Sequence, residues 1–406
     1  MAQSRAELDI ALSAVHVNHQ ISPHADTWTA FCAKLCETLA VPLHVARVTV
    51  QRDGGKGLEA AARGARYRAF AAIDADVVAL AHHLDDQAET VLLQALRGAG
   101  LKGISGMPVV KKSKQDQRKM IVRPLLAVAS TAIAAYAVQH KLNWIEDESN
   151  DDTRYFRNYL RHEVLPRIAV HAPHYRDSLT RLAQHAAEAQ QLLDELAGID
   201  STSEVEQQHL RLKALLMLSD PRAKNLLRYF FSQMEIPIPN AVQLDEMLRQ
   251  LRSREPDDRT EIAWADRVLR CHAGLIHIDV AAEHRVEAWR ITWRGETELL
   301  LPQSCGLLRL KPGIGVGIAR SQLLEGTVTI RSRIGGEHLR PDASRPQRTL
   351  KNLLQEASIP PWQRDRMPLL FSGETLVWAP GIGVNAGFAA GPDQDSISLS
   401  WRPEET

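Results

Sequence analysis

The sequence lacks the features that mark membrane, secreted and disulfide-stabilised proteins. No run of apolar residues reaches the ~18 that a transmembrane helix needs, so we expect no membrane partner. Residues 1–9 have no apolar core and include acids, which is unlike a secretion signal and favours a cytoplasmic protein. Four cysteines are too few for a disulfide scaffold. Cys32 and Cys36 would share one helix face, but no second Cys or His pair at metal spacing accompanies them. We therefore interpret them as small buried thiols rather than as a zinc or redox site.

The chain also has no excess of charge of either sign. Its 49 lysines and arginines balance 49 aspartates and glutamates, which taken globally argues against an indiscriminate nucleic-acid binder. Hydrophobic residues make up 44% and charged residues 24%, as in soluble globular proteins, so wholesale disorder is excluded. At roughly 150 residues per domain, the length predicts two or three domains.

The first region of the chain alternates short apolar runs with amphipathic patterns. This alternation predicts an α/β domain with a doubly wound, mostly parallel sheet. The strand-like runs are 10–17, 42–50 and 76–81, and the helical patterns are 26–39, 57–73 and 85–96.

The rest of the chain changes from helical to β-like patterns. Helical spacing covers 175–251, with a polar stretch at 198–206 that we interpret as a loop or linker. The later elements are β-like runs at 275–280, 289–293, 307–310 and 328–330, and a helix at 349–357. We therefore predict an α/β domain over 1–185, a helical middle domain over 186–320 and a small α+β C-terminal domain over 321–406.

The densest polar cluster, His82-His83-Leu84-Asp85-Asp86, follows the third apolar run and opens the next helix. In open α/β sheets, ligands bind beyond the carboxyl ends of the strands. The acids alone would suit the first turn of a helix, through capping and the helix dipole. Together with two histidines they favour a site in which His82 and Asp86 bind a magnesium-nucleotide or relay protons. Mg²⁺ prefers carboxylate oxygens to imidazoles, which makes Asp86 the candidate metal ligand.

Two further segments are candidates for substrate contact. Residues 96–107 are rich in glycine, but no helix is expected to start after the glycines, so we interpret them as a lid or a close-approach turn rather than a Walker loop. From Trp144 to His162, acids run into arginines and asparagines at helical spacing. This pattern fits either a salt-bridged helix start or carboxylates near a cationic substrate with arginines near phosphate.

The segment 331–366 is the one markedly basic stretch, with eight cations against four acids and a net charge of +4. A solvated basic face is the usual meaning of such a run. Contact of its spaced arginines with nucleic-acid phosphates is the alternative.

Eight segments, in order along nearly the whole chain, together resemble the tRNA(Ile)-lysidine synthetase family of the PP-loop ATP-pyrophosphatase superfamily. Any one motif is weak, whereas eight in the right order are highly specific. They are Ala14-Val15-His16-Val17-Asn18-His19; Gly57-Leu58-Glu59-Ala60 with Arg63 and Arg66-Tyr67; the 82–90 cluster; Arg97-Gly98-x-Gly100; Arg123-Pro124-Leu125-Leu126; Asp147-x-Ser149-Asn150 with Arg157-Asn158 and Arg161; Gly335-Gly336-Glu337 with Leu339-Arg340-Pro341 and Leu350-Lys351; and Pro360-Pro361-Trp362 with Arg364 and Arg366.

The resemblance implies a ligase that uses ATP and Mg²⁺ to join free L-lysine to the wobble cytidine of tRNA(Ile) with the anticodon CAU, through an adenylated cytidine. It implies tRNA binding by the middle and C-terminal domains and allows a homodimer. Catalytic roles would fall to His82, Asp86 and Asp147, of which Asp147 would favour the lysine ammonium. The implied cofactor-binding residues are Arg63, His83 and Asp85. The implied substrate-binding residues are Arg97, Arg123, Asn150, Asn158, Arg161, Arg340, Arg348, Lys351 and Arg364.

One departure from the family concerns its signature. The string Ser-Gly-Gly-x-Asp-Ser does not occur in the sequence, so we expect the PP-loop and the first strand to be missing. A start assigned too far downstream explains this, because the later segments match; a truncated form is the alternative. Two other functions remain open: a non-catalytic tRNA-binding homologue, and another PP-loop tRNA-modifying enzyme such as a thiolase, for which Cys32 and Cys36 are thin support.

Overall fold

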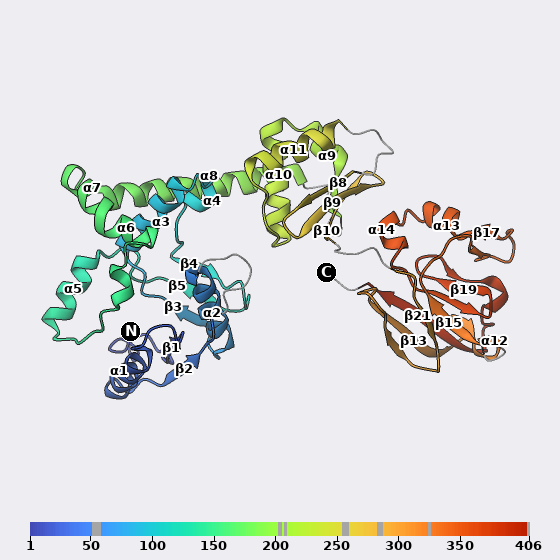
Figure 1. Ribbon diagram of the computed structural model, residues 1–406, viewed down its shortest axis with the longest axis horizontal. Helices are drawn as coiled ribbons and strands as arrows, with labels where there is room; N and C mark the ends of the chain where they lie inside the picture. The colour runs from blue at the N-terminus through green and yellow to red at the C-terminus, as the bar shows by residue number, and fades with distance from the viewer. Residues whose placement is uncertain are drawn as a thin grey trace. The chain divides into compact units, whose positions relative to one another are not determined.

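The computed structural model describes residues 1–50, 58–201, 205–206, 209–253, 260–281, 287–323 and 326–403. The chain divides into two compact units, Met1–Leu193 and Asp194–Thr406, which are described separately below (Figure 1). No helix within the described ranges is long and apolar enough to cross a membrane. Gly57, at the start of the helix predicted over 57–73, lies outside the described residues, as do the side chains of Leu58 and Glu59.

The first unit is the predicted α/β domain. β1 (Ala14–Asn18) pairs in parallel with β2 (Leu43–Arg47). β3 (Val77–Ala79) pairs in parallel with β5 (Met120–Val122), and β4 (Val110–Lys112) adds an antiparallel edge. Parallel neighbours need a crossover, which α1 (Ala25–Thr38) supplies between β1 and β2. In the described part of this unit the strands form two sheets rather than a single continuous one.

Helix α2 (Leu58–Ala72) packs against strands of both sheets. Its Tyr67 and Phe70 share a small core that also contains residues of β1, β3 and β5, which are Val15, Val17, Val78 and Ile121. The end of α2 is fixed by Lys119, whose side chain is 9% exposed and whose ammonium donates to the carbonyl oxygens of Phe70 (3.5 Å), Ala71 (2.6 Å) and Ile73. A cation suits these carbonyls because they carry the negative end of the helix dipole.

Helix α3 (Leu84–Leu96) begins directly after β3 with a capping box. The backbone N–H of Asp86 donates to His83 Nδ1, and the N–H of His83 donates to the Asp86 carboxylate at 3.0 Å. The remaining helices of the unit are α4 (Leu101–Ile104), α5 (Ser130–Gln139), the 3₁₀ turn η1 (Glu148–Asp151), α6 (Phe156–Tyr159), the π-helical turn η2 (Leu160–Val164), α7 (Leu165–His171) and α8 (Tyr175–Ser201).

The linker predicted over 198–206 is wrong in its first part, because α8 continues through Ser201. These polar residues continue a long helix that begins at Tyr175, and this context overrides the preference of the local composition for a loop. Val205–Glu206 form the short strand β6.

The second unit begins with the helical middle region, which packs on an antiparallel sheet of order β6-β7-β10-β9-β8. Leu226 and Phe231 of one helix and Leu244 and Met247 of the next are all but fully buried in one core with strand residues such as Leu269. The elements are β7 (His209–Arg211), α9 (Leu212–Met217), α10 (Asp220–Gln233), α11 (Ala241–Arg252), β8 (Glu261–Trp264), β9 (Arg267–His272) and β10 (Leu275–Val280).

The small C-terminal α+β region follows in the same unit (Figure 1). One sheet has the order β11-β15-β18-β19-β20 and another the order β12-β13-β21-β14, and Leu308, Ile330 and Leu370 lie in their shared core. The strands are β11 (Arg290–Thr292), β12 (Glu298–Leu300), β13 (Leu307–Ile314), β14 (Ile318–Ala319), β15 (Val328–Arg331), β16 (His338–Leu339), β17 (Arg348–Thr349), β18 (Leu369–Ser372), β19 (Thr375–Ala379), β20 (Gly383–Val384) and β21 (Asp395–Arg402). The helices are α12 (Arg320–Leu323), α13 (Leu350–Glu356), α14 (Pro361–Arg364) and the 3₁₀ turn η3 (Ala386–Phe388).

Candidate active site

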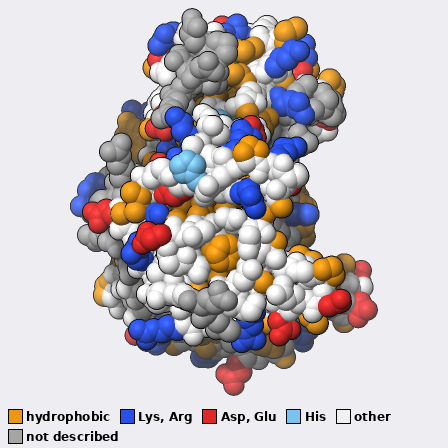
Figure 2. Space-filling view, turned by 90° about the vertical axis from the view of Figure 1, so that its right-hand side faces the viewer, with side chains coloured by type: hydrophobic (Ala, Val, Ile, Leu, Met, Phe, Trp, Pro, Cys, Tyr) orange, Lys and Arg blue, Asp and Glu red, His pale blue; other side chains and the backbone are white. Residues whose placement is uncertain are grey.

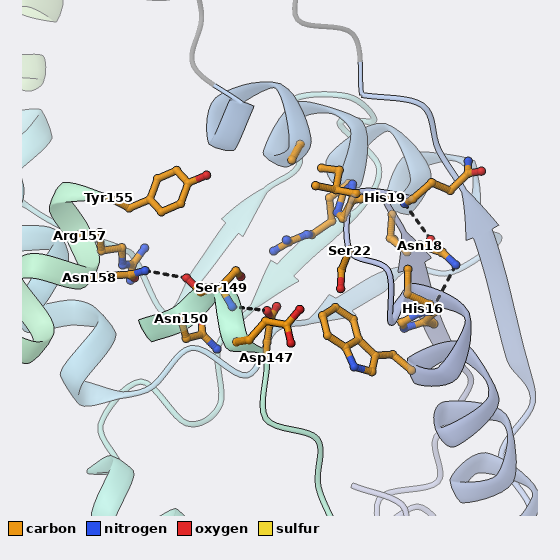
Figure 3. A pocket seen from close by; sticks show the side chains of 18 of the residues that line it. His16, Asn18, His19, Ser22, Asp147, Ser149, Asn150, Tyr155, Arg157 and Asn158 are labelled. Atoms are coloured by element: carbon orange, nitrogen blue, oxygen red, sulfur yellow. Dashed lines mark hydrogen bonds between the residues drawn. The ribbon is translucent and has the colours of Figure 1, made fainter. Parts of the chain in front are cut away.

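A pocket of about 620 Å³ lies in the first unit, beyond the carboxyl ends of β1 and β3 (Figure 3). Asn18 ends β1, and His82 follows β3 by three residues. The opposite wall comes from η1 and from α6 with η2. Of the predicted site residues, the pocket brings together His82, Asp86, Asp147, Asn150, Asn158 and Arg161.

The wall at the end of β1 is built on Asn18, which is 2% exposed. Its Nδ2 donates to Asp26 Oδ1 and Thr29 Oγ1, both at 3.1 Å, and so fixes the start of α1. On either side, His16 Nε2 and both ring nitrogens of His19 are buried without a hydrogen-bond partner among the described residues. Burial lowers the pKa of both histidines, and Arg66 lowers the pKa of His19 further. This wall therefore offers neutral imidazoles.

His82 lines the pocket and also contacts Arg123, which lies outside it. Burial, with the nearby positive charges of Arg123, Arg63 and Arg157, lowers its pKa to about 4, although Asp86 opposes the shift. Arg123 Nε donates to His82 Nδ1 at 3.3 Å, so the ring proton is assigned to Nε2. At neutral pH His82 is therefore a hydrogen-bond donor through Nε2 rather than a cation.

Asp86 belongs to a network of ion pairs with Glu89, one turn further along α3. Glu89 has a side chain that is only 2% exposed, and it accepts from Arg157 Nε at 2.9 Å and from Arg161 Nε at 2.6 Å. The same two guanidinium groups donate to Asp86 Oδ1 at 3.1 and 3.3 Å. Glu89 thus holds both arginines at the pocket wall, and its hydrogen bond raises the pKa of Arg161.

Asp147 is held by the turn that follows it (Figure 3). Its Oδ1 accepts from the Ser149 N–H at 2.9 Å, and Asn158 Nδ2 donates to the carbonyl oxygens of Ser149 (2.9 Å) and Asp152 (3.1 Å). Asn158 therefore links α6 to η1 through these two hydrogen bonds. Asp147 thus lines the pocket with one carboxylate oxygen held by this turn.

The surroundings of Asp86 do not fit a magnesium ligand. Its Oδ1 faces two guanidinium groups and its Oδ2 accepts from the His83 N–H. Among the described residues no group of three or more His, Cys, Asp or Glu side chains could hold a metal ion. The carboxylate oxygens of Asp86 are thus occupied by protein donors in this structure, and Mg²⁺ binding by Asp86 stays a prediction.

Several predicted residues of the first unit lie outside the pocket. His83 caps α3, and Asp85 accepts from the Ser130 N–H and pairs with Arg176. Burial alone would raise the pKa of Asp85, but these hydrogen bonds hold it below its usual value. Arg97 is exposed at the C-cap of α3, while Arg63 and Arg123 lie behind His82.

The predicted residues of the second unit lie in the C-terminal region, apart from this pocket's lining. Arg348 pairs with Glu356, and Arg364 is 8% exposed and donates to the Ile359 carbonyl oxygen at 2.7 Å. Arg340 and Lys351 are exposed. On the face drawn in Figure 2, Lys and Arg side chains are dispersed among acids and apolar groups.

Sequence reasoning assigned no role to Trp28, Tyr155 or Glu89. Trp28 and Tyr155 line the pocket, and Glu89 organises its arginines. The spacing of Glu89 from Asp86 was a usable signal, because residues three apart on a helix share one face.

Comparison with known proteins identifies the family. The tRNA(Ile)-lysidine synthase of Nitrosomonas europaea is 43% identical over 398 residues, which cover 98% of this chain and 87% of that protein. The chain belongs to the tRNA(Ile)-lysidine synthase family. Lysidine synthases of Burkholderia pseudomallei and Coxiella burnetii are 39% and 36% identical, covering 96% and 97% of this chain and 88% and 87% of theirs.

Family models agree with this membership along the chain. Residues 1–168 match a PP-loop domain, 210–277 a TilS substrate binding domain and 328–401 a TilS substrate C-terminal domain. The expectation that the PP-loop is missing is therefore corrected at the level of the domain: residues 1–168 of this chain match a PP-loop domain. That expectation depended on one short string, whereas the matched range contains the whole succession from β1 to η2. The chain is thus a member of a family of PP-loop ligases that modify tRNA.

Proposed function

We propose that this protein ligates free L-lysine to C2 of the wobble cytidine of tRNA(Ile) bearing the anticodon CAU. ATP supplies the adenylyl group: cytidine O2 bonds to its α-phosphorus, and pyrophosphate leaves. The ε-amine of lysine then forms a bond to C2 while the C2–O2 bond breaks, and AMP leaves with that oxygen. The modified base pairs with A rather than with G.

The observation that supports this proposal most is the shared pocket of Asp147 with Arg157 and Arg161. An amino acid with a cationic side chain needs a carboxylate near its ammonium groups and a guanidinium near its own carboxylate. Asp147 offers the first, and the arginines held by Glu89 offer the second. The Nε2–H of neutral His82 is a donor for a developing negative charge without adding a formal charge.

The unpartnered ring nitrogens of His16 and His19 fit the donor and acceptor edges of a purine base. We therefore assign the adenosine of ATP to the β1 side of the pocket and lysine to the η1 side. In the second unit, Arg340 and Lys351 are the candidates for tRNA phosphate, since they are exposed and no described carboxylate pairs with them. The domain roles over 1–185, 186–320 and 321–406, a cytoplasmic location and a homodimer complete the proposal.

The test is mass spectrometry of tRNA(Ile) after incubation with ATP and isotopically labelled lysine. It should use the full 406-residue chain. Label appearing on the wobble cytidine of the CAU anticodon is the expected result. Binding of tRNA without release of pyrophosphate would favour a non-catalytic homologue, and a sulfur-containing product would favour a thiolase.

A further inference from the structure

Near His82, three cations lie close together, and two of them contact one buried tyrosine. Arg63 comes from α2, Lys111 from β4, and Arg123 from the residue after β5. The Arg63 guanidinium lies 5.3 Å and the Lys111 ammonium 5.6 Å from the centre of the Tyr67 ring. Lys111 and Tyr67 have no role in the function proposed above.

The cluster lacks a counter-charge within the described part of the chain. Arg123 is 1% exposed, yet its side chain donates to neutral partners: the Pro108 carbonyl oxygen at 2.7 Å and His82 Nδ1 at 3.3 Å. Burial lowers the pKa of Lys111, and the positive charges of Arg123, Arg63 and Lys114 lower it further. Buried charges are ordinarily paired, because an unpaired one loses its hydration without compensation.

A fourth donor lacks an acceptor at the same place. Tyr67 is 9% exposed, and its hydroxyl is buried with no hydrogen-bond partner among the described residues. Guanidinium, ammonium and phenol groups all donate and none carries negative charge at neutral pH, which is the donor set that binds phosphate oxygens. The cluster also adjoins the pocket, since Arg123 contacts the pocket residue His82.

We propose that Lys111, Arg123, Arg63 and the Tyr67 hydroxyl form a phosphate-binding subsite that is joined to the pocket through His82. The subsite follows from these contacts, whereas the source of the phosphate depends on the proposed function. The source is either the polyphosphate of ATP, which leaves as pyrophosphate, or a phosphodiester of the tRNA.

The test measures binding of inorganic pyrophosphate by isothermal titration calorimetry to the full chain, without lysine, tRNA or turnover. Lys111→Gln should weaken binding roughly tenfold, which corresponds to one lost charge-assisted hydrogen bond. Tyr67→Phe keeps the ring and removes only the hydroxyl, so it should weaken binding by a smaller factor. Lys112→Gln is the matched control, because Lys112 is the next residue of β4 and its side chain points to the opposite face.

A second measurement separates the two sources of phosphate. If pyrophosphate binding does not depend on Lys111, but Lys111→Gln weakens tRNA binding and reduces its salt slope by about one, the phosphate belongs to RNA. Without ligand, Lys111→Gln should raise the Tm, because it relieves repulsion within the cluster; a purely structural lysine would lower it. Unchanged binding of both ligands in Lys111→Gln would overturn the subsite. A chain that forms no lysidine but binds pyrophosphate through Lys111 would contradict the proposed function and leave the subsite intact.

Discussion

Glu89 and Arg161 are joined across the first unit by a hydrogen bond of 2.6 Å between Oε1 and Nε. The glutamate lies inside the domain, with a side chain that is 2% exposed, and the arginine reaches it from the pocket wall. The arginines near the pocket therefore owe their positions to a residue that does not line it.

Glu89→Ala should leave two guanidinium groups without their main counter-charge. Removing one partner of a buried ion pair costs about 3 kcal/mol, so we expect a loss of that size in the free energy of unfolding, measured by urea titration. Glu163→Gln is the control, since its pair with Arg167 is exposed and should contribute less than about 1 kcal/mol. Equal effects of the two substitutions would contradict the role assigned to Glu89.

Asp147→Asn should raise the KM for lysine roughly tenfold, because it removes the charge while an amide oxygen can still accept from the Ser149 N–H. The KM for ATP should change much less. Asp151→Asn serves as the control in the same 3₁₀ turn, because its side chain is 86% exposed and does not line the pocket. A fall in kcat with an unchanged KM for lysine would argue against lysine recognition by Asp147.

The pH dependence of stability should report the neutral state of His82. Its pKa is about 4 in the folded chain against an ordinary value of 6.5, so between these values the unfolded chain binds the proton more tightly. The contribution of His82 is therefore fully present above about pH 6.5 and is lost as the pH falls toward 4. Urea titrations over this range should show a steeper decline for the native chain than for His82→Asn. Parallel declines would mean that His82 is not held neutral.

Lys119→Met should destabilise the domain by about 1–3 kcal/mol, because it leaves the last carbonyl groups of α2 without their buried donor. Thermal unfolding measures the effect, and Lys34→Met on the exposed side of α1 is the control. Amide exchange near the C-terminal end of α2 should increase as well, because the last turn loses the donor that fixes it. Unchanged exchange there would show that Lys119 does not cap this helix.

The sequence was sufficient to predict the alternating elements and the place of the His82–Asp86 cluster. Both follow from local signals. These are the spacing of apolar residues, an apolar run that is followed by polar residues, and an acid in the first turn of the next helix, where it can cap that helix. Asp86 has the capping role that the sequence allowed and also pairs with Arg157, while its role in catalysis stays a prediction.

Pairing over long distances along the chain could not be predicted in this way. Glu89 and Arg161 are 72 residues apart, and Arg123 and His82 are 41 apart. No periodicity relates such positions, because their contact depends on how α3 packs against η2 and how β5 pairs with β3. Within the basic segment 331–366, composition gives the net charge of +4 but does not tell which arginines are paired, as Arg348 is with Glu356 and Arg331 with Glu337.

Two charge clusters lie near His82, and they give the electrostatic potential around the pocket an uneven distribution. On one side, Asp85, Asp86 and Glu89 are matched by an equal number of arginines, and their fields largely cancel. On the other side, the field of Arg63, Lys111 and Arg123 is not cancelled by any described carboxylate and reaches about 8 Å before salt screens it. This positive field therefore orients a molecule with phosphate at one end while the molecule is entering the pocket, before any hydrogen bond has formed.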